Sequence, residues 1–298
     1  MGPFRNALST ELAMWGQALD SPAVRTVFFG GGTPSYLPDG DIGKVLELAR
    51  RAFAVEDSAE ITIEANPGDL SARSCTALLA QGVNRLSIGV QSLNNDLLEL
   101  LGRRHRANEA VAAFETARDA GFDNINLDLM FAIPGQTMDL WQATLAEVIA
   151  MGSEHLSCYE VIYEEDTPLY EQLQAGEFDV DDGLACSMYD ELIDNAATAG
   201  FAQYEVANFA RHDGSSDAEL PSCASQHNVN YWRGGAYQAL GPSATGYVDG
   251  RRIRNIANTD RYCEQLALGQ RAHESVEQLS PLARAGEMAA FGLRMNVG

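Results

Sequence analysis

Two kinds of hydrophobic pattern alternate along the first half of the chain. Helices are predicted where apolar positions recur every three or four residues, over 4–19, 41–53, 71–81, 95–101, 108–120 and 137–151. Strands are predicted in short runs of β-branched and other apolar residues, over 25–29, 61–67, 85–91, 124–133 and 155–163. Strands and helices that alternate about every 25–40 residues, without adjacent hairpin strands, predict an α/β fold of βαβ units around a parallel sheet, either open or closed as a barrel.

Most of the predicted strands have one apolar face and one face of polar or small residues. In residues 61–66, isoleucine and alanine alternate with threonine, glutamate and asparagine. Parallel strands covered by helices on both faces read as continuous apolar runs, and a packed barrel fills its interior with branched apolar side chains. The alternation therefore predicts a barrel with a polar inner face that holds a ligand. Glu64, Gln91 and Asp128 fall late in their strands, at the end of the sheet where α/β folds bind ligands.

Three consecutive glycines, at 30–32, end the first predicted strand, and Thr33 and Pro34 follow them. Proline does not continue a central strand, and residues without side chains let a ligand reach main-chain N–H and C=O groups directly. A turn of this kind also occurs without any ligand. The three polar residues that converge beside it favour a binding site.

Composition narrows the classes of function. The chain has 298 residues, of which 46% are hydrophobic, enough for a core in one or two domains. A net charge of −22 argues against nucleic-acid binding, which needs a basic surface. No apolar run reaches about 18 residues and no signal-peptide pattern begins the chain, so we expect a cytoplasmic protein without a transmembrane segment. The five cysteines include no C-x-x-C pair, which predicts reduced thiols and no local metal site.

Five motifs resemble, in order and spacing, the radical S-adenosylmethionine (SAM) proteins of the HemN/HemW group. This group comprises the oxygen-independent coproporphyrinogen III oxidases and the HemW-type haem chaperones. The motifs are F-G-G-G-T-P at 29–34, I-E-A-N-P at 63–67, G-V-Q-S-L at 89–93, L-G-R-R-H at 101–105 and L-D-L-M-F-A-I-P-G-Q-T at 127–137.

The resemblance implies a partial (β/α)6 TIM-like barrel over residues 1–175, lacking its first strand, and a smaller α+β region over 176–298. It also implies SAM laid across the open end of the barrel. Matched position by position, it gives the SAM-binding residues as Gly31, Gly32, Thr33, Glu64, Gln91, Arg103, Asp128 and Ile162. The glycine turn would meet the methionine end of SAM, the polar side chains would line the rest, and the isoleucine would pack on the adenine.

The second half contains Q-H-N-V-N-Y-W-R at 226–233, which resembles the H-N-x-x-Y-W stretch of HemW-type proteins. His227 with Tyr231 and Trp232 combines a candidate iron ligand with flat aromatic faces, an arrangement that suits haem. A purely structural corner is the alternative. Further along, an Asp-Gly pair at 249–250 predicts a two-residue hairpin turn, and arginines at 251, 252 and 254 follow it as candidates to meet haem propionates.

The chain departs from this group in one defining feature. It lacks the C-x-x-x-C-x-x-C loop whose thiolates hold a [4Fe–4S] cluster in the group. The helix predicted over 4–19 resembles the segment after that loop, so we expect the first strand and the loop to precede Met1, and residues 291–298 resemble the entry to a further domain. Without the thiolates, radical chemistry is not expected of the chain as written. No catalytic and no metal-binding residue is assigned.

Three functions follow as hypotheses. The leading one is a haem chaperone that binds haem or a related porphyrin and hands haem to haem-requiring proteins. The second is an oxygen-independent coproporphyrinogen III oxidase, which decarboxylates propionate side chains in porphyrin biosynthesis. The third, outside the family, is a barrel hydrolase or lyase that uses Glu64 and Asp128 as acid and base. That third function gives no role to the glycine turn or to Gln91.

Overall fold

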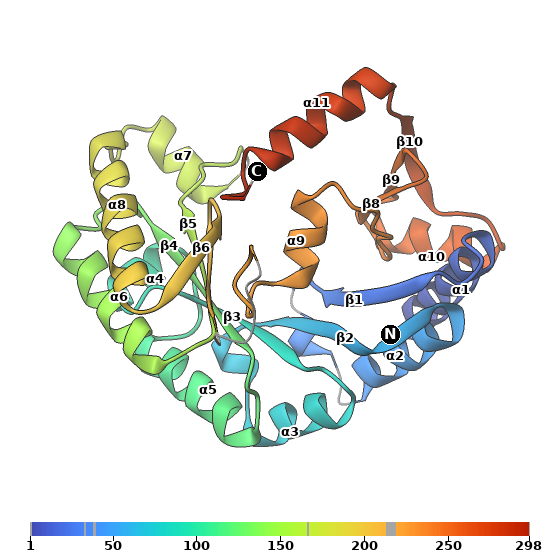
Figure 1. The fold of residues 1–298 in the computed structure, drawn as a ribbon, viewed down its shortest axis with the longest axis horizontal. Helices are drawn as coiled ribbons and strands as arrows, with labels where there is room; N and C mark the ends of the chain where they lie inside the picture. Colours follow the sequence, from blue (N-terminus) through green and yellow to red (C-terminus); the bar gives the residue numbers. More distant parts are fainter. Residues whose placement is uncertain (1, 33, 38–39, 166, 213–218, 298) are drawn as a thin grey trace.

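The computed structural model describes residues 2–32, 34–37, 40–165, 167–212 and 219–297. A seven-stranded sheet in the order β1-β2-β3-β4-β5-β7-β6 curls into half of a barrel (Figure 1). The strands are β1 (Ala23–Phe29), β2 (Ala54–Ala65), β3 (Arg85–Gln91), β4 (Ile125–Phe131), β5 (His155–Glu160), β6 (Phe201–Glu205) and β7 (Asn208–Arg211). β1 to β5 run parallel, whereas β7 is antiparallel to both β5 and β6. The partial barrel predicted from the sequence is confirmed.

Helices connect the parallel strands and cover the outer face of the sheet (Figure 1). They are α2 (Asp41–Ala52), α3 (Ala72–Ala80), α4 (Asn95–Leu100), α5 (Ala107–Ala120), α6 (Met138–Met151), α7 (Pro168–Gln174) and α8 (Asp182–Thr198). Local residues set several of their ends. The side chains of Ser71 and Thr137 accept backbone N–H groups at the starts of α3 and α6. Gly121 and Gly152 end α5 and α6 in the left-handed conformation.

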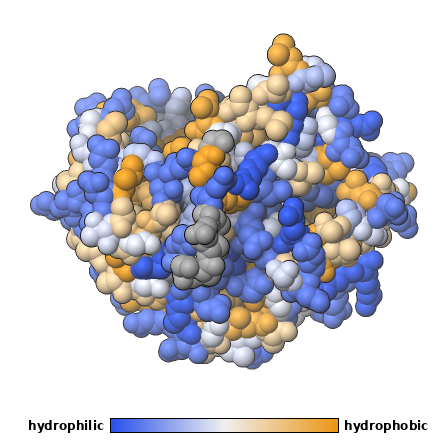
Figure 2. Space-filling model, viewed as in Figure 1, coloured by the Kyte–Doolittle hydropathy of each residue, from blue (hydrophilic) through white to orange (hydrophobic). Residues whose placement is uncertain are grey.

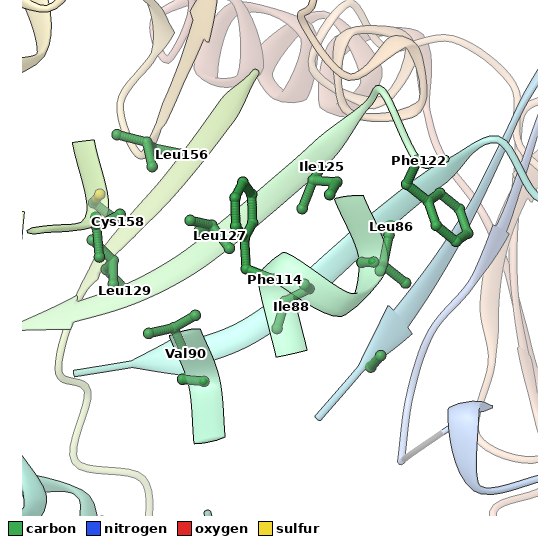
Figure 3. Packing of buried hydrophobic residues seen from close by; sticks show 14 of the residues in the cluster. Leu86, Ile88, Val90, Phe114, Phe122, Ile125, Leu127, Leu129, Leu156 and Cys158 are labelled. Carbon is green, nitrogen blue, oxygen red and sulfur yellow. The ribbon is translucent and has the colours of Figure 1, made fainter. Parts of the chain in front are cut away.

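The main core lies between the outer face of the sheet and these helices. Its members include alternate residues of three neighbouring strands and a phenylalanine of α5. Figure 3 shows Leu86, Ile88, Val90, Phe114, Ile125, Leu127, Leu129 and Leu156 packed together. Burying a side chain of this size stabilises the fold by roughly 1.5–3 kcal/mol. The apolar half of the alternating pattern therefore forms the core, and the polar half faces the inside of the barrel.

The inner face carries a buried hydrogen-bonded network. The Nδ2 group of Asn126 donates to Ser87 Oγ at 2.7 Å and to Asp128 Oδ1 at 2.8 Å. The His155 ring bridges Asn126 Oδ1 at 2.6 Å and Tyr204 Oη at 2.8 Å. Burial holds the pKa of His155 well below its ordinary value. The polar inner face predicted from the sequence is confirmed.

A second, three-stranded antiparallel sheet stands beside the first strands of the barrel (Figure 1). It comprises β8 (Thr245–Val248), β9 (Arg251–Asn255) and β10 (His273–Gln278). Asp249 and Gly250 join β8 to β9 with φ angles of 53° and 74°, which confirms the predicted hairpin turn. Three helices belong to this part of the chain: α9 (Gln226–Trp232), α10 (Thr259–Ala267) and α11 (Pro281–Gly292).

A buried carboxylate of α1 (Gly2–Ala18) ties the start of the chain to this second sheet. Glu11 is 3% exposed, and it accepts hydrogen bonds from Gly241 N at 2.9 Å, Asn255 Nδ2 at 2.6 Å and Tyr262 Oη at 2.6 Å. Three donors satisfy the carboxylate in a place where an unpaired charge would be costly. Burial nevertheless raises the pKa of Glu11.

Some boundaries differ from those predicted. β2 begins at Ala54, because its polar first half pairs with β1 where no apolar pattern shows it. β5 ends at Glu160 beside the end of β4, so the predicted strand over 155–163 is too long. The division predicted between 175 and 176 falls just after α7, while β6 and β7 beyond it complete the barrel sheet. That division stays a prediction.

Candidate ligand site

The glycine turn follows β1 and contacts β2. Gly31 N donates to Glu64 Oε2 at 3.1 Å. Gly31 and Gly32 have φ angles of 80° and 72°, which side chains disfavour. A Cβ at Gly30 would lie 2.6 Å from Phe28 Cε1 and 3.0 Å from Glu64 Oε1. Conformation and close approach therefore both require glycine here. Thr33 lies outside the described residues.

Two half-buried carboxyl groups lie at this end of the inner face. Burial raises the pKa of Glu64, the hydrogen bond from Gly31 N lowers it, and the nearby Asp128 charge raises it again. Burial also raises the pKa of Asp128, against donation from Ser87 Oγ at 3.0 Å and from Asn126 Nδ2. Gly31 N engages only Oε2 of Glu64, so Oε1 accepts no hydrogen bond within the described residues. Both oxygens of Asp128 already accept one, Oδ2 from Ser87 and Oδ1 from Asn126, and each has a second lone pair for a ligand.

Gln91 and Arg103 also belong to this end of the barrel, one at the end of β3 and the other just after α4. Gln91 ends β3 with a φ of 65°, beside a register irregularity between Gly89 and Gln91. Its amide folds back over Gly89, where a Cβ would lie 2.9 Å from Gln91 Nε2. Arg103 follows α4. Burial lowers the pKa of its guanidinium, and the charge of Asp128 raises it. The charge of Arg103 is therefore close to that of Asp128, whose backbone lies opposite Gly89 in the pairing of β3 with β4.

Ile162 lies beyond the end of β5 and is 74% exposed. The neighbouring Val161 N donates to Phe131 O at 3.0 Å, which keeps this segment at the carboxyl edge of the sheet. Tyr159, which sequence reasoning did not single out, is 42% exposed beside Met130 of β4. Desolvation and the Asp128 charge raise the pKa of Tyr159. Alternation along β5 was the signal for its inward position.

His227 comes from α9 and packs against β1. It stands in the first turn of α9, and its ring stacks on Phe28 of β1 with a centroid distance of 5.0 Å and an angle of 25°. Its Nδ1 lies 3.1 Å from Thr26 Oγ1. Burial lowers the pKa of His227, which favours a neutral imidazole. Phe28 therefore touches both the ring of His227 and the glycine turn region.

Tyr231 and Trp232 lie one turn further along α9, away from Phe28. The two rings contact each other edge to face at 4.8 Å, and both contact Phe291 of α11, at 5.3 and 5.7 Å. Arg294 lies over Trp232 at 4.2 Å and pairs with the fully buried Glu205 at 3.0 Å. The structure therefore brings His227, Tyr231 and Trp232 onto one short helix, with the histidine in the barrel and the aromatic pair against α11.

Two buried charged residues of the inner face were missed by sequence reasoning. Glu60 of β2 is 6% exposed and accepts the backbone N–H groups of Gln226 and His227 at 3.0 and 3.1 Å. Arg85 of β3 is 2% exposed, and its charge lowers the pKa values of both His155 and His227. Only the alternation within each strand could have indicated them, because their partners are distant in sequence.

The described residues do not fit an iron–sulfur cluster. Within them, no three His, Cys, Asp or Glu side chains are grouped as a metal site. Cys75 and Cys158 are buried, Cys186 is exposed, and Cys223 and Cys263 are half-buried. Burial raises the pKa values of the Cys75 and Cys158 thiols, which disfavours the thiolates that ligate iron.

The surface in Figure 2 is mostly hydrophilic, as the net charge requires, and hydrophobic side chains gather where α11 begins. α11 has no buried residue, and Leu282 and Leu293 near its ends are 84% and 86% exposed. Within the described part of the chain, no helix is both long and apolar enough to span a bilayer.

Comparison with known proteins identifies relatives across the whole chain. A family model described as "Radical SAM superfamily" matches residues 5–148. The heme chaperone HemW of Bacillus subtilis is 33% identical over 297 residues, which cover 99% of this chain and 76% of that protein. The Radical S-adenosyl methionine domain-containing protein 1, mitochondrial, of mouse is 34% identical over 307 residues, covering 100% of this chain and 67% of that protein.

A solved structure shares the fold. Coproporphyrinogen III oxidase (HemN) from Escherichia coli, described as a radical SAM enzyme, superposes with a TM-score of 0.83 at 24% sequence identity. The match covers 97% of this chain and 68% of that one, and at this identity it speaks for the fold alone. Because the chain is also 33% identical to HemW proteins over nearly its full length, it belongs to the HemW family of the radical SAM superfamily.

Proposed function

We propose that this protein is a haem chaperone, which binds haem and delivers it to haem-requiring proteins. Membership of the HemW family supports the proposal. The single observation that carries it is the geometry of His227. Its Nδ1 is engaged by Thr26, whereas no hydrogen bond within the described residues involves Nε2. The side chain is half-buried, and Nε2 is the ring nitrogen that we propose for the iron.

The other four histidines are poorer candidates for the iron. Both ring nitrogens of His155 are engaged, and that side chain is fully buried. His105 is 6% exposed, with Nε2 at 3.1 Å from Val90 O. His212 is exposed. His273 stacks on Trp15, and burial, together with the nearby charge of Arg271, lowers the pKa of His273. His227 differs from these four because a hydroxyl holds its Nδ1 and it stands on the same short helix as Tyr231 and Trp232.

The aromatic surface around Tyr231 and Trp232 suits a flat macrocycle, because π faces and ring edges contact such a ligand over a large area. The haem propionates need cations. Arg252 is engaged by Glu277 at 2.9 Å and by Glu287, so it is not free to meet them. Arg254 is exposed and has no ion pair within the described residues, which makes it the better candidate of the three predicted arginines.

SAM is the second ligand that we propose, at the glycine turn. The backbone of Gly31 and Gly32 and the carboxyl group of Glu64 suit the ammonium and carboxylate of its methionine end. Gln91, Arg103 and Asp128 would line the rest of the molecule, and Ile162 would offer an apolar contact to the adenine. SAM supplies, when bound, a sulfonium that an iron–sulfur cluster can reduce. The role of these residues here is to bind and orient it.

The decisive test is titration of the purified protein with haem, followed by the Soret band. We expect saturable binding in the wild type and a loss of at least ten-fold in affinity in His227→Ala. His273→Ala, which removes a half-buried histidine outside α9, serves as the matched control and should bind as the wild type does. Transfer of the bound haem to an apo-haem protein completes the function. Unchanged binding by His227→Ala contradicts the proposal, and decarboxylation of coproporphyrinogen by the protein would favour the oxidase.

A further inference from the structure

The first turn of α9 is held by side chains of β1 and β2 rather than by its own sequence alone. Glu60 accepts the backbone N–H groups of Gln226 and His227, and Ser225 Oγ donates to the same carboxylate at 3.4 Å. The N–H groups of Gln226 and His227 are among the backbone donors that the start of a helix leaves unpaired. Because Glu60 is almost fully buried in the strand, the backbone of His227 is fixed relative to the barrel.

The imidazole ring is fixed as well, by two residues of β1. Phe28 covers one face of the ring, and Thr26 Oγ1 lies 3.1 Å from Nδ1. Thr26 and Phe28 are two residues apart on one strand, so they project to the same face of the sheet. A threonine hydroxyl is able to accept a hydrogen bond from Nδ1–H or to donate one to an unprotonated Nδ1. The two cases leave Nε2 as an acceptor or as a donor, and only the acceptor binds a metal.

We propose that Thr26 is a positioning residue for haem iron: its hydroxyl accepts the Nδ1–H of His227 and thereby presents the Nε2 lone pair to the metal. The inference rests on the proposed function, since it concerns how the same histidine binds. Histidine ligands in metal sites commonly donate their second N–H to a nearby acceptor, which fixes both the tautomer and the ring plane. Here the acceptor is a neutral hydroxyl. The imidazole of His227 would therefore donate electrons to the iron less strongly than an imidazole whose Nδ1–H is bound by a carboxylate.

Thr26→Val removes the acceptor and keeps the shape of the side chain. The Nδ1–H then has no partner, the ring loses its preferred tautomer, and haem affinity should fall by about ten-fold or more, the range typical of such supporting contacts. Thr26→Ser restores a hydroxyl and should restore affinity. Thr62→Val is the matched control, because Thr62 Oγ1 is buried on the neighbouring strand and has no partner within the described residues.

The readout that separates positioning from general stability is the iron–histidine stretching frequency of the ferrous haem complex, measured by resonance Raman spectroscopy. Hydrogen bonding at Nδ1 raises this frequency, so Thr26→Val should lower it, while Thr26→Ser and Thr62→Val keep the wild-type value. The double variant Thr26→Val/His227→Gly with added imidazole provides the frequency of a ligand without the Thr26 contact. Equal frequencies in wild type, Thr26→Val and the imidazole complex would overturn the inference. If His227→Gly alone keeps the wild-type spectrum and affinity, the proposed function fails instead.

Discussion

The pair between Glu205 and Arg294 offers the sharpest test of the fold around the candidate haem surface. Glu205 is fully buried and accepts Arg294 Nη2 at 3.0 Å, Arg294 Nε at 3.3 Å and Ala207 N at 2.9 Å, with Asn208 Nδ2 as a further donor. Arg294 also holds the last described segment to β6, since Val206 N donates to Arg294 O at 3.1 Å. We therefore expect Arg294→Ala to leave a buried carboxylate without its cation.

Removing one partner of a buried ion pair costs about 3–5 kcal/mol. The Arg294 side chain is 38% exposed, and two amide donors remain on Glu205, so the free energy of unfolding should fall by less than that range, about 2–3 kcal/mol. For a chain of this length that corresponds to a decrease in Tm of roughly 3–5 °C. The cation above the indole of Trp232 is lost too, which should change the fluorescence of that tryptophan.

Urea unfolding followed by circular dichroism measures the change, with thermal unfolding as a second measurement. Arg254→Ala is the control, because that arginine is exposed and unpaired within the described residues, and it should alter the free energy by less than about 0.5 kcal/mol. The double variant Glu205→Leu/Arg294→Met should be less damaging than Arg294→Ala, because it leaves no buried charge unpaired. If Arg294→Ala behaves like Arg254→Ala, the carboxylate does not depend on this cation and the reasoning is wrong.

Three further predictions concern separate sites. Burial raises the pKa of Glu11 above its ordinary 4.5, so the native chain keeps this carboxyl protonated to a higher pH than the unfolded chain does. In urea unfolding, the stability of the wild type relative to Glu11→Gln should therefore decrease as the pH rises from about 4 to 6. Because the pKa of His227 lies below its ordinary 6.5, the stability of the wild type relative to His227→Gln should decrease as pH falls from about 7 to 5. Gly31→Ala places a side chain at positive φ in open space, so we expect the free energy of unfolding to fall by about 1–2 kcal/mol. Gly68→Ala should change it by almost nothing, because Gly68 has no positive φ and a Cβ there also meets open space.

Local patterns in the sequence predicted the barrel well. Period-two alternation separated core from inner face, and Asp249-Gly250 predicted its hairpin because turn chemistry is contained within two residues. The contacts of Glu60 and Glu205 were not predictable in this way. Glu60 is one of four acidic residues in β2, and Glu205 is the last residue of β6. In both places the sequence alone is equally compatible with a solvated edge. Their partners lie 166 and 89 residues away, and no local spacing rule reaches that far.

The long sequence separation of such contacts also limits when the site around His227 can form during synthesis. The carboxylate of Glu60 lies 166 residues before the backbone N–H that it caps at Gln226. At about 5–20 residues per second, the ribosome needs roughly 8–33 s to make that intervening stretch. β3 to β7 are made within this interval and can pair as they appear. Until α9 is made, however, Thr26, Phe28 and Glu60 lack the contacts that it gives them. The candidate haem-binding histidine thus joins β1 and β2 only after most of the barrel sheet has been made, and its site is complete only once synthesis has passed residue 232.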